Sequence, residues 1–118
     1  QGYGPILRMA TKGQLKANLI FWRRQALNSG LLMERKIWRI PRSTRYPEGI
    51  KYRMVLVDPK VHSVILLYDN HWPKGPHVHW DNKERSYEFK GIEKLLEDFF
   101  QEAKVEEARY HENKKDHY

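Results

Sequence analysis

The spacing of the apolar residues changes once along this chain, at Gly91, and this change constrains the fold more than any other feature. After Gly91 the apolar residues follow the i, i+3, i+4, i+7 spacing of an amphipathic helix, with acidic residues on the opposite side. The apolar positions are Ile92, Leu95, Leu96, Phe99, Phe100 and Ala103. Before Gly91 the apolar residues recur with a period near two, which is typical of strands. The sequence therefore predicts a sheet with one C-terminal helix that covers one of its faces.

Five segments before the helix have the composition and alternation of strands. They are residues 15–27, 31–40, 50–57, 61–69 and 85–90. Asn, Ser and Gly at residues 28–30 predict a tight turn, so the first two segments form a hairpin. Residues 61–69 are apolar in both phases, which predicts a central strand buried on both faces. We expect an α+β fold in which about five mostly antiparallel strands pack against the C-terminal amphipathic helix in two layers.

The length of 118 residues suits one domain whose core needs no crosslink, and the chain has no cysteine. We expect this single domain at residues 13–105. Residues 1–12 form an N-terminal extension, and the stretch before Met9 could derive from a cloning vector. Residues 106–118 read as a charged C-terminal tail. No apolar stretch approaches the ~20 residues of a membrane helix, so we expect no membrane contact and a cytoplasmic protein.

The net charge of +7 is unevenly distributed. Residues 1–53 contain 12 Lys and Arg against 2 acids, whereas residues 54–118 contain 10 against 13. Aromatic residues lie among the cations of the first half. Such a surface suits the phosphate backbone of a nucleic acid or an acidic protein partner, and a solvated basic face without a partner is the third interpretation.

A histidine-rich segment, LLYDNHWPKGPHVHWD at residues 66–81, is the candidate for chemistry. His77 and His79 are two residues apart, so in an extended backbone both rings project from the same face. With Glu84 they could hold a divalent metal ion such as zinc or manganese. Without metal they could serve as general acid and base on a ribose-phosphate bond, with Asp69 orienting one ring. The alternative is structural: the histidines bond to Asp69 and to the turn.

Several short motifs occur in a characteristic order. They are Phe21-Trp22-Arg23-Arg24, Ile37-Trp38-Arg39-Ile40-Pro41, Lys51-Tyr52-Arg53, Tyr68-Asp69-Asn70, Lys74-Gly75-Pro76-His77-Val78-His79, Tyr87-Glu88-Phe89 and Leu95-Leu96-Glu97-Asp98-Phe99. In this order and at these intervals they resemble the TumE-like toxins of bacterial and archaeal type II toxin-antitoxin loci, over residues 15–105. The resemblance implies a toxin whose partner is a helix-turn-helix antitoxin encoded beside it. It does not imply a particular reaction.

Arginines beside aromatic residues on three of the expected strands have the composition of an RNA-processing surface. We therefore expect a small nuclease with His77, His79 and Asp69 as catalytic residues. The residues expected to bind nucleic acid are Arg23, Arg24, Arg39, Arg53, Lys74, Trp38 and Tyr52. Two alternatives stay open: a non-catalytic basic module that binds nucleic acid or the antitoxin, and a metal-dependent enzyme for a small substrate. An exposed sheet edge could also be covered by a second copy or by an antitoxin strand.

Overall fold

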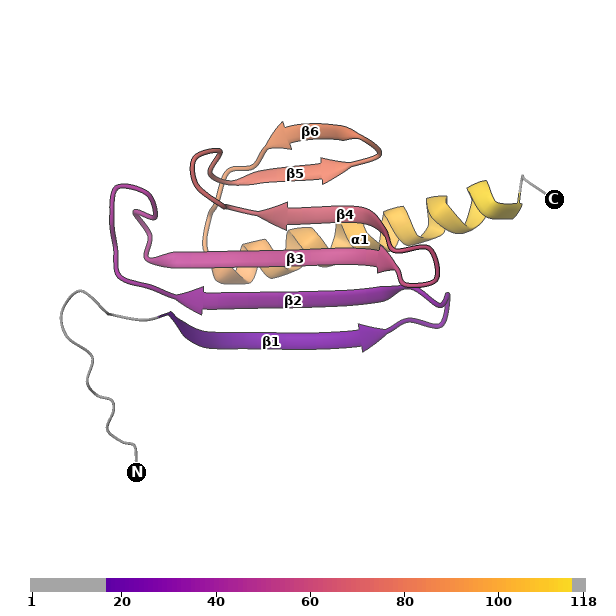
Figure 1. Cartoon of the computed structure of the whole chain (residues 1–118), viewed down its shortest axis with the longest axis horizontal. Helices are drawn as coiled ribbons and strands as arrows, with labels where there is room; N and C mark the ends of the chain where they lie inside the picture. Colours follow the sequence, from indigo (N-terminus) through magenta and orange to yellow (C-terminus); the bar gives the residue numbers. More distant parts are fainter. Residues whose placement is uncertain (1–16, 116–118) are drawn as a thin grey trace, which may run out of the picture.

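The computed structural model describes residues 17–115, which form an antiparallel sheet followed by one long helix (Figure 1). The elements are β1 (Asn18–Ala26), β2 (Leu32–Arg39), β3 (Ile50–Asp58), β4 (Ser63–Asp69), β5 (His77–Trp80), β6 (Lys83–Ser86) and α1 (Ile92–Lys115). The strands lie in chain order, and each pairs antiparallel with the next. The predicted α+β arrangement in two layers is confirmed, with six strands in the sheet where about five were expected.

The additional strand belongs to a short hairpin that the alternation of residues did not reveal. β5 and β6 have four residues each, too few for a clear period. The segment predicted at 85–90 overlaps β6 only at its start, and Tyr87 and Phe89 instead pack against the core on the way to α1. Asp81 and Asn82 join β5 to β6 with φ of 50° and 59°, as a two-residue turn of this hand requires.

The core lies between α1 and one face of the sheet. Leu95, Phe99 and Ala103 of α1 are fully buried, and Figure 1 shows the helix lying behind β3 and β4. Phe99 meets the ring of Tyr68 edge-on, with 5.3 Å between the centroids. The helix continues to Lys115, so most of the segment predicted as a charged tail is helical. No helix within residues 17–115 is long and apolar enough to cross a membrane.

The opposite face of the sheet is not covered by a helix of the described chain, and we call it the open face (Figure 1). This explains why β4 is not buried on both faces as predicted: Val64 points to the open face and is exposed. The polar and aromatic side chains that the strand register assigns to the open face are Trp22, Arg24, Glu34, Lys36, Trp38, Lys51, Arg53, Asp69, His77, His79, Glu84 and Ser86.

Candidate nucleic-acid interface

Strand register decides which of the predicted site residues share a face, because directly paired residues of neighbouring strands point to the same side. One row of successive partners crosses the whole sheet on the open face. It consists of Trp22, Lys36, Arg53, Asp69, His77 and Ser86. Arg53 therefore lies between Lys36 and Asp69, so cations from the first half of the chain stand beside the histidine segment.

A second row runs parallel to the first. It consists of Arg24, Glu34, Val55, Leu67, His79 and Glu84. Trp38 pairs with Lys51 on the same face. The indole N–H of Trp22 donates to Glu34 at 2.9 Å, and the Lys36 ammonium lies 5.4 Å from the Trp22 ring centre. The edge of the open face thus presents an oriented aromatic ring next to a cation.

Three of the residues expected to bind nucleic acid lie on the opposite side of the sheet. Tyr52 is fully buried in the core and stacks on Phe89 with 6.0 Å between the centroids. Burial raises the pKa of Tyr52 well above its ordinary value. Arg23 and Arg39 are exposed, but the register assigns them to the face that α1 covers elsewhere. Because neighbouring residues of a strand point to opposite faces, Tyr52 and Arg53 could not both contact one ligand on the open face.

His77 is held inside the protein on both sides of its ring. Only 6% of the residue is exposed. Nδ1 donates to the Gly75 carbonyl at 2.6 Å, and Nε2 lies 3.2 Å from Oδ1 of Asp69. The same Asp69 oxygen accepts the backbone N–H of His71 at 3.2 Å. His77 and Asp69 together therefore tie the loop between β4 and β5 to the sheet.

His79 has a different environment, although its ring lies edge-on to that of His77 with 4.6 Å between the centroids. Its side chain is 35% exposed, and Nδ1 lies 3.5 Å from Oε1 of Glu84. Glu84 in turn accepts a bond of 2.7 Å from Lys74. That bond lowers the pKa of Glu84, so the carboxylate keeps its charge at a lower pH than an ordinary glutamate does. Glu84 can orient His79 through Nδ1 and leave Nε2 on the far side of the ring.

The set proposed for a metal ion does not converge on one point. His77 turns to Asp69 whereas His79 turns to Glu84. Within the described part of the chain, no three His, Asp or Glu side chains are grouped so that they could hold a metal.

Two loops extend the open face at the end where β4 finishes. The loop of residues 41–49 contacts the β4–β5 loop through a hydrogen bond of 3.1 Å, in which the backbone N–H of Trp72 donates to the Tyr46 hydroxyl. The Arg45 guanidinium lies 4.1 Å from the Trp72 ring centre, and Lys51 lies 3.4 Å from Nδ1 of His71. A cavity of about 290 Å³ opens there. It is lined by Asp69, His71, Trp72, Pro73, Lys74 and His77.

The sequence motifs did not show which residues near the end of β4 are structural and which face solvent. Asn70, the last residue of the Tyr-Asp-Asn motif, is buried and bonds to the backbone of Tyr52 and Ile50, so it extends the pairing of β3 with β4.

Lys36 was not among the residues predicted to bind nucleic acid. The signal for it is its position two residues before Trp38, which places both on one face of β2.

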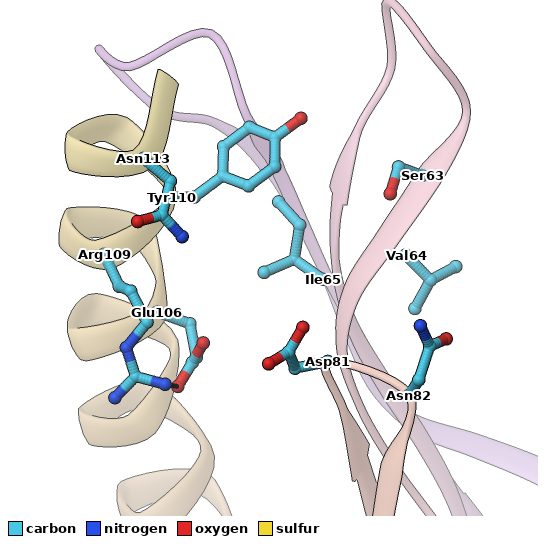
Figure 2. Close-up of a pocket in the computed structure, with 9 residues that line it drawn as sticks. All are labelled: Ser63, Val64, Ile65, Asp81, Asn82, Glu106, Arg109, Tyr110 and Asn113. Carbon is cyan, nitrogen blue, oxygen red and sulfur yellow. Dashed lines mark ion pairs between the residues drawn. The ribbon is translucent and has the colours of Figure 1, made fainter. Parts of the chain in front are cut away.

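A separate cavity lies at the opposite end of β4, between α1 and the turn joining β5 to β6. Figure 2 shows Asp81 pointing across this cavity toward Glu106 and Arg109 of the helix. Its volume is about 220 Å³, and Glu106 and Arg109 form an ion pair of 3.1 Å within it. It shares no residue with the cavity beside His77.

The fold and its open face define a class of small α+β proteins that present cations, aromatic rings and a histidine pair on an uncovered sheet. The chain belongs to the TumE toxin family, because the family model described as Toxin TumE matches residues 8–109. The resemblance found in the motifs is thereby confirmed. The protein is the toxin component of a toxin-antitoxin system, and its family implies an antitoxin partner. Comparisons with curated proteins and with solved structures found no match.

Proposed function

We propose that this toxin acts on RNA at its open face, as a small nuclease. The observation that carries the proposal is the row that places Lys36 and Arg53 beside Asp69 and His77. Cations in such a row bind successive phosphates, and exposed indoles such as Trp22 stack on unpaired bases. The histidine segment then lies where a bound RNA backbone would cross the sheet.

His79 is the residue we assign to proton transfer. Its ring is partly exposed, and Glu84 lies on the Nδ1 side, so Nε2 can exchange a proton with a ribose hydroxyl or a leaving oxygen. Arg53 and Lys74 supply positive charge for the phosphate during the reaction. His77 and Asp69 act as positioning residues, because their mutual contact fixes the ring against which His79 packs.

A second candidate is a non-catalytic module that binds RNA on the same face. One observation favours it: both ring nitrogens of His77 are engaged by oxygen atoms of the protein, as in a histidine that stabilises a turn. In this case the toxin would inhibit growth by binding an RNA and not by cleaving it.

The test compares wild-type toxin with His79→Ala and with His111→Ala, an exposed histidine of α1 that serves as the matched control. Growth and total RNA are followed after induced expression in a bacterial host, and circular dichroism checks each fold. His79→Ala is more informative than His77→Ala, because the His77 ring is buried and bonds to Gly75 and Asp69, whereas the His79 ring is partly exposed. We expect His79→Ala to restore growth and intact RNA, and His111→Ala to behave as wild type.

Purified proteins separate the two candidates. With a short single-stranded RNA oligonucleotide, the nuclease proposal expects His79→Ala to bind as wild type and to cleave at least about a hundredfold more slowly. If the folded variant stops growth as the wild type does and neither protein cleaves, the nuclease proposal is wrong and the binding module stands.

A further inference from the structure

The two edges of the sheet are protected to very different degrees. Within the described chain β1 and β6 are the outer strands. β6 has four residues, all polar or charged, which is a usual way for proteins to discourage pairing with another chain. β1 has nine residues, no proline and no acidic residue. A long edge of this kind leaves main-chain N–H and C=O groups available to an added strand.

The side chains of β1 reinforce this difference. Every residue of β1 except Phe21 is exposed, including Leu19, Ile20 and Trp22. Trp22 has 53% of its surface exposed at the border of the open face. Apolar surface and unpaired main chain occur together here, and a strand laid along β1 would cover both at once.

Charge indicates which strand fits. β1 carries Arg23 and Arg24 on its two faces and no acid of its own. Arg23 pairs with Arg35 of β2, whereas Arg24 pairs with Glu34. Lys36 adds a further cation on β2. A second copy of β1 would bring four arginines together, and like charges on paired strands destabilise the pairing. An extended segment rich in Asp and Glu would instead meet a cation on each face.

We infer that β1 is the docking edge for the antitoxin, which adds an extended acidic segment as a seventh strand beside Asn18–Ala26. The inference rests on the toxin family and not on the RNA chemistry proposed above. The added strand would border the open face at Trp22 and Arg24, so its carboxylates would compete with phosphates for the outermost cations.

Hydrogen exchange of the toxin, alone and with its purified cognate antitoxin, tests the inference. We expect the amides of β1 to gain protection in the complex, whereas those of β6 exchange as in the free toxin. Protection of β6 instead, or of the strands around the histidine segment without β1, would overturn the inference. So would protection of β1 that increases with the concentration of toxin alone, because a second copy would then be the occupant.

A main-chain variant sharpens the test. Ile20 is the extra residue of a bulge, since Leu19 pairs with Trp38 and Phe21 with the adjacent Ile37. Proline is tolerated at bulges of edge strands but obstructs a neighbouring strand. We expect Ile20→Pro to keep the fold and to weaken antitoxin binding at least about tenfold, whereas Ile20→Ala, which retains the N–H, binds nearly as wild type. Equal binding by the two variants would contradict docking on β1.

Discussion

At the scale of single residues, the two histidines of the open face should differ sharply in their effect on stability. His77→Ala removes a buried ring, leaves the Gly75 carbonyl without the donor it has in wild type, and takes from the Asp69 carboxylate its contact with the ring. We expect it to lower the free energy of unfolding by roughly 2–4 kcal/mol. His79→Ala, which removes a partly exposed ring, should lower the free energy of unfolding by about 1 kcal/mol or less.

Urea denaturation of both variants measures this difference directly. Similar midpoints for His77→Ala and wild type would show that the ring does not anchor the loop. The result also governs how functional data are read, since loss of toxicity in a His77 variant would not distinguish chemistry from unfolding.

The roles of these residues could be predicted from the sequence only in part. The two-residue spacing predicts that His77 and His79 share a face, and the register agrees. Which ring is buried depends on the fold of the loop between β4 and β5, where the Gly75 carbonyl happens to face Nδ1 of His77. A contact of this kind depends on the path of the backbone, which residue types and spacing do not specify.

At the scale of elements, α1 should owe its attachment to the sheet to one side of the helix. Phe99 is fully buried, whereas the neighbouring Phe100 is 41% exposed. We expect Phe99→Ala to lower the free energy of unfolding by about 3–5 kcal/mol. Phe100→Ala, which removes the same atoms, should cost about 1 kcal/mol or less. Thermal or urea unfolding of the pair checks this, and equal losses would mean that the helix is oriented differently.

A polar link between α1 and the sheet should make stability depend on pH. Burial alone would raise the pKa of Glu102, but bonds from Arg85 at 2.7 Å and Tyr68 at 2.6 Å outweigh it and lower that pKa below 4.5. A carboxylate with a lowered pKa in the folded state stabilises fully above its unfolded pKa, and this contribution is lost as pH falls through the lowered value.

Glu102→Gln should therefore destabilise the protein by about 1–3 kcal/mol near neutral pH. The difference between wild type and variant should shrink once the pH falls below 4.5, the ordinary value for Glu102. Unfolding free energies measured across this range provide the test, and Glu112→Gln at the exposed end of the helix is the control. A difference that is the same at every pH would show that the charge of Glu102 contributes nothing.

The helix could be predicted with its correct start because more than two turns of apolar spacing leave no other interpretation. Its end could not, because residues 106–115 are largely charged and only the folded structure places Tyr110 within bonding distance of Asp58. The β5–β6 hairpin was missed for a related reason. Strands of four residues are stabilised by pairing with β4, which their own composition does not reveal.

At the scale of the whole molecule, the charge asymmetry of the sequence has a spatial counterpart. The cationic first half supplies β1, β2 and most of the cations of the open face, whereas α1 carries many of the acids. The sequence could predict a basic surface, but alternation places Arg23 and Arg39 on one face and Arg24 and Arg53 on the other. The sequence did not show which of these arginines lie on the open face. That assignment requires the register between strands and the side of the sheet on which α1 packs.

RNA affinity should therefore depend on which cations are removed and not only on how many. Three cations lie close together on the open face: Lys36 pairs with Arg53, and Lys51 precedes it by two residues on β3. Replacing all three by Gln should reduce the slope of log affinity against log salt for single-stranded RNA by about 2, because fewer counterions are released. The His79→Ala background keeps the oligonucleotide intact during the titration.

The matched control replaces Lys60, Lys83 and Lys90 by Gln. These three lysines are exposed and are not among the residues that the strand register assigns to the open face. It changes the net charge by the same amount, so any effect of overall charge is common to both triple variants. The control should bind nearly as wild type with an unchanged slope. If both variants lose the same slope, RNA is held by the net charge of the molecule, and the open face is not the binding surface.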